Sequence, residues 1–354
     1  MMPVKEDKSQ SHKVALYTPN TKYIPNKFMM QRSLLIFEHS IKSKFTLLQY
    51  KHKLETFLEF SKVKNYDSLA ALDTDTIQSL LEDYILDMKV QGLKPITIKN
   101  YLSAPKLFFD MNRKLYHRKI LSKLIPEMQK EGNEMPYTTD DVIMMLAATK
   151  LKRTRALIHF FASTGARPNV LEDPILRMEH LYDMPGGSKA ILFYAGSREE
   201  YWAFLTPEAA ASFEEYFDER RESGENLKPK SPVFKNRAPK KSKTEHMSTS
   251  TCREVMLTLV RKSRIERSKS GERFDKAVIY GFRKRFNTIL KTNNSVNYNI
   301  AEKLMGHKNG LDGVYLKPTR EQCFAEFAKA ISELTVHPSK IPEIIQNTQV
   351  VSAN

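Results

Sequence analysis

The stretch LMGHKNGLDGVY, residues 304–315, carries the pattern on which our fold prediction rests. A helix that ends at Gly306 would place His307 just past its last turn, and a glycine-bearing loop then leads to Tyr315. A lone histidine or tyrosine is more often structural than functional. The stretch therefore gains meaning only together with the motifs that precede it.

The first of these motifs is STGARPN, residues 163–169, which follows the apolar segment ALIHFFA. Gly165 permits a bend after this segment, and the bend would hold Arg167 at the mouth of a buried helix. Taken alone, Arg167 could instead form a salt bridge at a helix end.

The second motif is YGFRKRF, residues 280–286. Phe282 and Phe286 lie four residues apart and would anchor one helix face in the core. Arg283 lies next to that face, and Tyr280 lies three residues before it at the helix start. Taken alone, such a helix is most often a plain basic surface.

These residues match the needs of phosphodiester cleavage without a metal. That reaction requires cationic donors for the non-bridging oxygens, a nucleophile, and an acid for the leaving oxygen. Arginine suits the first task because its planar fork binds phosphate bidentately and keeps its proton. The ordered set of two arginines, a histidine and a tyrosine is far less expected by chance than any single motif.

In order and spacing the motifs resemble the tyrosine recombinases, whose catalytic domain carries Arg, then His-x-x-Arg, then Leu-Gly-His, then Tyr. The resemblance covers nearly the whole chain, because the helical segment 30–130 is similar to the core-binding domain of that family. It implies a mainly α fold with a small β-sheet: a helical core-binding domain plus an α+β catalytic domain. It also implies DNA cleavage and rejoining through a covalent 3′-phosphotyrosine, with no metal and no cofactor.

The resemblance assigns roles residue by residue. Arg167 and Arg283 would clamp the scissile phosphate, His307 would assist by hydrogen bonding or proton transfer, and Tyr315 would attack. Tyr280 stands where most members have histidine, and this Tyr-x-x-Arg variant resembles some archaeal integrases.

The family's proton donor is a lysine on the turn between two strands. We expect strands at AILFYA (190–195) and EYWAFLT (200–206), joined by the tight turn GSRE. This turn offers Arg198 in place of the lysine, and Lys189 is the alternative. Arginine is a poorer donor because its pKa stays above about 12. The general acid is therefore open between these two residues.

The charge distribution favours a polyanionic partner, and we expect double-stranded DNA. The chain carries a formal net charge of +16 and a pI near 9.5. Residues 228–291 hold 19 Lys and Arg against five Asp and Glu, a net charge of +14. A surface of this kind would contact phosphates, although a solvated basic surface without a ligand is the plainer alternative.

Other partners and compartments are less compatible with the composition. The sequence shows no apolar run that could span a bilayer and no apolar signal-peptide core in MMPVKEDKSQ. Its two cysteines, Cys252 and Cys323, form no CxxC pair, which argues against a disulfide framework or a cysteine-built zinc site. We expect a cytoplasmic, nucleoid-associated protein.

Periodicity predicts helices at 46–60, 74–92 and 95–112 in the first half, and at 207–221, 249–264, 281–291, 296–305 and 319–334 in the second. The domain plan is an arm (1–29), a core-binding domain (30–130), a linker (131–138), a catalytic domain (139–336) and a tail (337–354). The basic residues that we expect to contact DNA are Lys44, Lys51, Lys99, Lys106, Lys284 and Arg285. An ordinary bundle with solvated lysines fits the first domain equally well.

The last helix has apolar residues at Cys323, Phe324, Phe327, Ala328, Ile331 and Leu334. In the family such a helix docks onto a neighbouring protomer, which implies a homo-oligomer, a tetramer on DNA. The alternative is that this stripe packs on its own domain.

Three functional alternatives stay open beside a recombinase of a mobile element. One is a Xer-like chromosome-dimer resolvase of the same family. Another is a DNA-binding protein of this fold that has lost catalysis, which the missing lysine and Tyr280 favour. The third is a basic RNA-binding protein, for which the sequence shows no recognisable RNA module.

Overall fold

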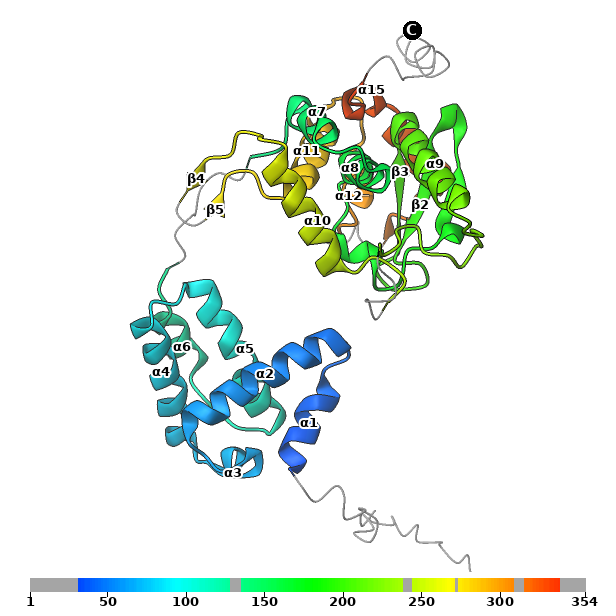
Figure 1. Ribbon diagram of the computed structural model, residues 1–354. Coiled ribbons are helices and arrows are strands. Elements are labelled where there is room, and N and C mark those ends of the chain that lie inside the picture. The colour runs from blue at the N-terminus through cyan, green and yellow to red at the C-terminus, as the bar shows by residue number, and fades with distance from the viewer. Residues whose placement is uncertain (1–30, 128–134, 238–243, 271–272, 309–314, 338–354) are drawn as a thin grey trace, which may run out of the picture. The chain divides into compact units, whose positions relative to one another are not determined.

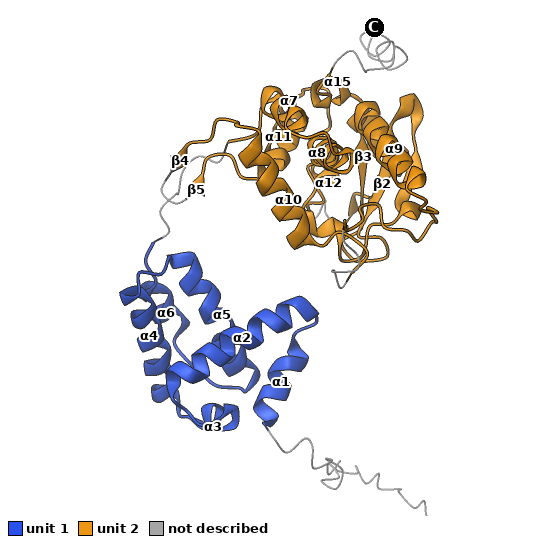
Figure 2. Cartoon of the chain, in the orientation of Figure 1, with its two compact units in different colours: residues 1–130 blue, residues 131–354 orange. Residues whose placement is uncertain are grey.

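The computed structural model describes residues 31–127, 135–237, 244–270, 273–308 and 315–337 (Figure 1). The chain divides into two compact units, residues 1–130 and 131–354 (Figure 2). The predicted arm lies outside the described residues, and so does the predicted tail beyond His337.

Helices form all the regular structure in the described part of the first unit: α1 (Arg32–Ser40), α2 (Lys44–Ser61), α3 (Tyr66–Ala71), α4 (Thr74–Val90), α5 (Pro95–Met111) and α6 (Arg118–Leu124). The three predicted helices are confirmed as α2, α4 and α5. The sequence missed α1, α3 and α6, because helices of six to nine residues are too short to establish a period.

Aromatic side chains fill the centre of this bundle. Phe57 of α2 lies edge-on to Tyr84 of α4 and Phe109 of α5, with ring centroids 5.1 and 6.0 Å apart. Edge-to-face pairs at these distances add to the free energy gained by burying the rings. The bundle therefore has its own core.

The second unit surrounds the buried helix α8 (Lys152–Thr164), which lies among the other helices and the sheet in Figure 1. Its other longer elements are α7 (Thr139–Ala147), β1 (Leu181–Asp183), β2 (Lys189–Phe193), β3 (Tyr201–Leu205), α9 (Pro207–Glu222), α10 (Thr249–Lys262), α11 (Tyr280–Thr292), α12 (Tyr298–Leu304), α14 (Arg320–Ala328) and α15 (Ile331–Leu334). The fold is thus mainly α with a small sheet, as predicted. Among the described residues no helix has both the length and the hydropathy needed to cross a bilayer.

The larger sheet has three antiparallel strands in the order β1-β2-β3, and the short strands β4 (Lys269–Ser270) and β5 (Arg273–Phe274) pair separately. Phe193 pairs with Tyr201 in the last register position, so the connection between β2 and β3 comprises residues 194–200. The predicted strand pair is confirmed, but the predicted tight turn is wrong. At the connection β2 ends two residues earlier and β3 begins one residue later than the apolar pattern suggested. The connection forms its own hydrogen bonds, such as Ser197 N–H to the Tyr194 carbonyl at 2.9 Å.

Residues 135–138, which the sequence assigned to a linker, belong to the second unit. Tyr137 is buried, its ring centroid lies 4.9 Å from that of Phe282, and its N–H donates to the Gly281 carbonyl at 3.2 Å. Thr138 then caps α7 in a capping box with Asp141. The polar composition of this stretch concealed a single aromatic anchor.

The C-terminal segment forms two helices where one was predicted, and α14 is separated from α15 by Lys329 and Ala330. The predicted apolar stripe is present, but it packs in a core of its own unit with Phe204 and Phe286. Phe327 and Ile331 are fully buried there. The described stripe therefore follows the second alternative, and a homo-oligomer stays a prediction.

Candidate active site

Arg283 joins the three sequence motifs in space. It lies on α11, whose Phe282 anchors it in the core, and only 6% of its surface is exposed. Its guanidinium donates to the Gly165 carbonyl at 2.8 Å, to the Met305 carbonyl at 2.7 Å, and to Nε2 of His307 at 2.8 Å. Segments more than a hundred residues apart in the chain therefore meet at one side chain.

The hydrogen bonds of His307 fix its tautomer. A guanidinium can only donate, so Nε2 is the acceptor from Arg283 and the ring proton lies on Nδ1. Nδ1 lies 2.8 Å from Oε2 of Glu302 and donates to it. Glu302 also forms an ion pair with Lys291.

The state of Glu302 follows from these bonds. Burial acts to raise the pKa of its carboxyl, but the hydrogen bonds from Lys291 and His307 outweigh burial and lower this pKa below its usual value. Glu302 is therefore a carboxylate at neutral pH and orients the imidazole toward Arg283.

Arg167 places a second cation beside Arg283. It is partly exposed and directly precedes the short 3-10 helix η2 (Pro168–Leu171). Burial is the main cause that lowers the pKa of Arg283, and the charge of Arg167 lowers it further, whereas Tyr201 and Tyr280 raise it. An anion such as a phosphate, bound between the two guanidiniums, would offset the repulsion between their charges.

Two glycines allow these segments to meet. Gly165 ends α8 in the left-handed conformation, with φ of 57°, and a Cβ there would lie 2.7 Å from the Phe286 ring. Gly306 has φ of 63°, and a Cβ there would lie 2.5 Å from the Tyr201 ring. Only glycine combines this backbone angle with such close approach.

We expect Gly306→Ala to lower the free energy of unfolding by about 2–4 kcal/mol, because left-handed strain and overlap with Tyr201 add together. Gly224→Ala is the matched control, since Gly224 has φ of 83° but no atom within 4 Å of its Cβ position. Strain alone should cost the control about 1 kcal/mol. Urea unfolding measures both values, and equal losses would contradict the packing role of Gly306.

The two acid candidates lie in different places. Arg198 is exposed on the β2–β3 connection. Lys189 lies at the other end of β2, four residues or about 13 Å from Phe193 along the strand. Its ammonium contacts Asp183 at 2.7 Å and Glu214 at 3.0 Å. Lys189 is thus held by two carboxylates at the end of β2 away from the β2–β3 connection.

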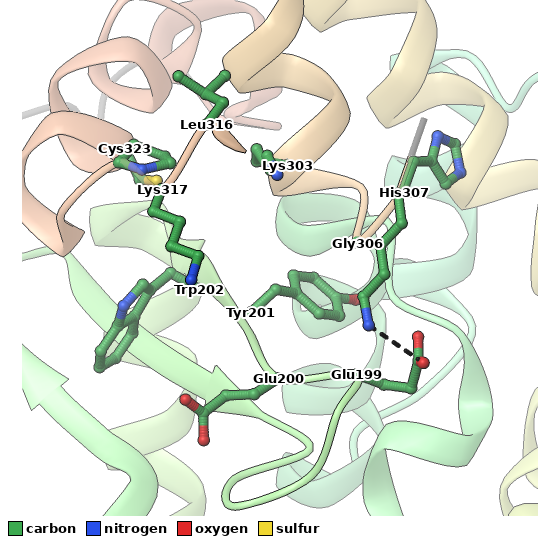
Figure 3. A pocket seen from close by; sticks show the side chains of 12 residues that line it. Glu199, Glu200, Tyr201, Trp202, Lys303, Gly306, His307, Leu316, Lys317 and Cys323 are labelled. Atoms are coloured by element: carbon green, nitrogen blue, oxygen red, sulfur yellow. Dashed lines mark hydrogen bonds and ion pairs between the residues drawn. The ribbon is translucent and has the colours of Figure 1, made fainter. Parts of the chain in front are cut away.

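A cavity of about 390 Å³ lies between the start of β3, the end of α12 and residues 316–318 (Figure 3). Tyr201, His307 and Lys308 line it. Lys308 contacts the β2–β3 connection: its ammonium donates to the Arg198 carbonyl and forms an ion pair with Glu199 at 3.2 Å.

Tyr315 directly precedes the cavity wall at Leu316, and 78% of its surface is exposed. Within the described ranges no hydrogen bond joins it to Arg167, Arg283 or His307. Residues 309–314, which connect it to His307, lie outside those ranges. The role of Tyr315 as nucleophile stays a prediction.

The predicted DNA contacts of the first unit lie as two pairs. Lys44 and Lys51 are exposed on α2, seven residues or about two turns apart, so they share a face. Lys99 and Lys106 have the same spacing on α5, and Lys106 is half-buried. Lys51 also forms an ion pair with Glu38 at 2.7 Å, which would have to open for a phosphate.

The prediction that Arg285 contacts DNA is wrong. Only 4% of its surface is exposed, and its guanidinium donates to Thr139 Oγ1 at 3.1 Å and to the Glu333 carbonyl at 3.0 Å. It joins α7 to the C-terminal helix α15. Its neighbour Lys284, about 100° away around the helix, is partly exposed and stays a candidate.

The basic run 228–291 is used in two ways. Some of its cations stabilise the protein, including Lys235 on Glu225 at 3.1 Å and Lys276 on Asp141 at 2.8 Å. Others are exposed: Lys228, Lys230, Arg237, Arg253, Arg261, Lys262, Arg264, Lys269 and Arg273. A net charge counted from sequence therefore overstates what a phosphate backbone could contact.

Glu302, Tyr201 and Lys308 are the site residues that the sequence did not identify. Glu302 lies five residues before His307, and the sequence alone does not show that it accepts from the imidazole. In the sequence Tyr201 looks like an ordinary strand residue, and only the structure shows that Gly306 packs against its ring. Lys308 was visible as the residue after His307, but its contact with the β2–β3 connection depends on tertiary structure.

Cys252 and Cys323 are free and buried, and burial raises the pKa of their thiols to about 12 and about 11. Within the described part of the chain no three His, Cys, Asp or Glu side chains form a group that could hold a metal ion.

No family model matches the sequence, and no curated protein matches it either. Solved structures do resemble the fold. The Tn1549 transposon integrase in complex with transposon right end DNA is 15% identical, with a TM-score of 0.56 over 84% of this chain and 97% of that one. The XerH site-specific recombinase bound to difH substrate, in a pre-cleavage complex, is 17% identical, with a TM-score of 0.52 over 75% of this chain and 74% of that one. At such low identity these likenesses show the fold.

Proposed function

We propose that this chain, which has the fold of the tyrosine recombinases, is a site-specific recombinase or integrase that breaks and rejoins double-stranded DNA. The observation that carries the proposal is the meeting of three motifs at Arg283, which contacts Gly165, Met305 and His307 directly. A protein that only binds DNA has no need for a buried arginine held beside a second arginine and an oriented histidine.

In the proposed reaction the phenol oxygen of Tyr315 attacks the scissile phosphorus. The bond from phosphorus to the 5′ oxygen breaks, which leaves a 3′-phosphotyrosine and a 5′-hydroxyl. Arg167 and Arg283 bind the non-bridging oxygens, where negative charge accumulates in the transition state. Attack by the 5′-hydroxyl of a partner strand on the phosphotyrosine then reseals DNA and restores Tyr315.

His307 has two tasks in this proposal. Its Nε2 accepts a hydrogen bond from Arg283 in the protein without DNA, which holds the guanidinium in place. A phosphate that draws the guanidinium NH2 away would leave Nε2 open to receive the phenol proton of Tyr315. The Glu302 carboxylate, 2.8 Å from Nδ1, would stabilise the imidazolium that results.

DNA binding outside the site is assigned to Lys44, Lys51, Lys99, Lys106 and Lys284, and to the exposed part of the basic run. These contacts should make affinity fall steeply with salt. Such a protein would act on DNA inside the cell. Assembly as a homo-oligomer belongs to the same proposal. Neighbours of both kinds, a transposon integrase and a Xer recombinase, share the fold, so integration and dimer resolution are both compatible with it.

Covalent trapping tests the proposal. Duplexes that bind would first be selected from a random library. The selected site would then be nicked just 3′ of the cleavage point, so that the short fragment with the new 5′-hydroxyl diffuses away after cleavage. We expect a protein–DNA adduct that survives denaturing electrophoresis and forms equally well in EDTA. Specific binding without any adduct would favour a DNA-binding protein that has lost catalysis, and preference for RNA in the selection would contradict both.

A further inference from the structure

We propose that Lys308 is the general acid that protonates the leaving 5′ oxygen. This assignment rests on the proposed function, because it concerns the same reaction at the same site. It replaces both Arg198 and Lys189, the two residues that sequence position alone offered for the task.

The position of Lys308 follows from the contacts of its neighbour. Nε2 of His307 lies 2.8 Å from the Arg283 guanidinium, and the Cα of Lys308 lies about 3.8 Å from the Cα of His307. A lysine side chain at this position can therefore reach a phosphate held by Arg283. Lys308 and His307 line the same cavity, which also opens next to residues 316–318, directly after Tyr315 (Figure 3).

The ammonium of Lys308 is held in place by the β2–β3 connection. It donates to the backbone carbonyl of Arg198 and pairs with Glu199 at 3.2 Å. An ammonium has three N–H donors, so these two acceptors leave one for a leaving oxygen. About half of the Lys308 side chain is exposed, and an exposed ion pair is weak enough for a DNA strand to displace Glu199.

The chemistry of the three candidates separates them. Arg198 contributes its carbonyl to this arrangement, and its guanidinium would give up a proton poorly. Lys189 is held by two carboxylates; burial acts to lower its pKa, but the hydrogen bonds to Asp183 and Glu214 outweigh burial and raise it, so its proton is held more tightly. Lys308 lines the cavity, directly follows the histidine that Arg283 contacts, and pairs with the β2–β3 connection.

Cleavage exchanges one bond to phosphorus for another and moves one proton. As the bond between the Tyr315 oxygen and phosphorus forms, the bond to the 5′ oxygen breaks and its electron pair stays on that oxygen. A proton moves from Nζ of Lys308 to the oxygen, which leaves a neutral amine and a 5′-hydroxyl. In the reverse direction the amine takes the proton back as the incoming 5′-hydroxyl attacks the phosphotyrosine.

A bridging phosphorothiolate tests the assignment, because a 5′ sulfur leaves without protonation. Single-turnover cleavage would be measured with saturating protein on ordinary and 5′-phosphorothiolate suicide duplexes. We expect Lys308→Ala to slow cleavage of the ordinary duplex by roughly 10²–10⁴-fold. On the sulfur duplex the same variant should cleave at nearly the wild-type rate. Lys308→Arg should behave like the alanine variant, since it keeps the charge but not the proton donor.

Lys329→Ala is the matched control. Lys329 is also a half-exposed lysine paired with a glutamate, Glu326 at 2.7 Å, and it lies at the end of α14 away from the cavity lining. Its rates should equal wild type on both duplexes. An equal defect of Lys308→Ala on both duplexes, or no defect, would overturn the assignment while wild-type cleavage upholds the proposed function. Sulfur rescue of Arg198→Ala instead would give Arg198 the role. No wild-type adduct on either duplex would overturn the proposed function itself.

Discussion

Arg283→Ala is expected to abolish detectable adduct formation and also to destabilise the second unit. The substitution removes a buried donor, and the Gly165 carbonyl, the Met305 carbonyl and Nε2 of His307 each lose a hydrogen bond. Each unsatisfied buried polar group costs about 1–3 kcal/mol, but removal of the buried guanidinium also removes the cost of taking its charge out of water. We therefore expect the free energy of unfolding to fall by about 2–4 kcal/mol. Urea unfolding and the trapping assay measure the two effects separately.

Arg283→Lys distinguishes the structural from the chemical contribution. A lysine keeps the positive charge but cannot donate to three acceptors and a phosphate from one rigid plane. We therefore expect intermediate stability, yet adduct formation at least 10²-fold slower, about the cost of losing one oriented donor. A lysine variant with wild-type cleavage would show that charge alone suffices and would contradict the bridging role of the guanidinium.

Tyr315→Phe is expected to eliminate the adduct without affecting the fold. The side chain is 78% exposed, so loss of one hydroxyl should change the free energy of unfolding by less than about 0.5 kcal/mol. Loss of a nucleophile lowers rates by roughly 10³-fold or more. DNA affinity should be retained, because the phenol is not among the proposed phosphate contacts.

Tyr182→Phe is the control for this substitution. Tyr182 lies on β1 and has 36% of its surface exposed. Its ring lies edge-on to that of Trp202, with the ring centroids 5.5 Å apart. It should form adduct at the wild-type rate. Persistence of an adduct in Tyr315→Phe would move the nucleophile to another residue, and Tyr280, close enough to Arg283 to shift its pKa, is the first to examine.

The fold was predictable from sequence where periods were long and motifs were local. Helices α2, α4 and α5 each run for at least 17 residues, so their apolar stripes are unambiguous. The motifs of Arg167, Arg283 and His307 could be located in the sequence because helix ends and glycines mark each of them, and the structure brings them together at Arg283. What the sequence could not supply was distance: that Arg283 contacts Gly165 and Met305 is a property of packing.

The errors have the same origin. In the sequence Arg285 looks like a surface cation. It lies two residues after Arg283 on the same helix and is buried, and α15 supplies the Glu333 carbonyl that accepts from its guanidinium. Tyr137 reads as part of a linker, although its ring fills the space above Gly281. Lys308 contacts the β2–β3 connection through a chain separation of more than a hundred residues, which no local pattern encodes.

The identity of the covalently modified residue tests the central claim most directly. Wild-type protein would be trapped on the nicked duplex, digested with nuclease and protease, and analysed by tandem mass spectrometry. We expect Tyr315 to carry a nucleotide, joined to the phenol oxygen through its 3′ phosphate. A nucleotide on Tyr280 or on any other residue, or a 5′ linkage, would contradict it.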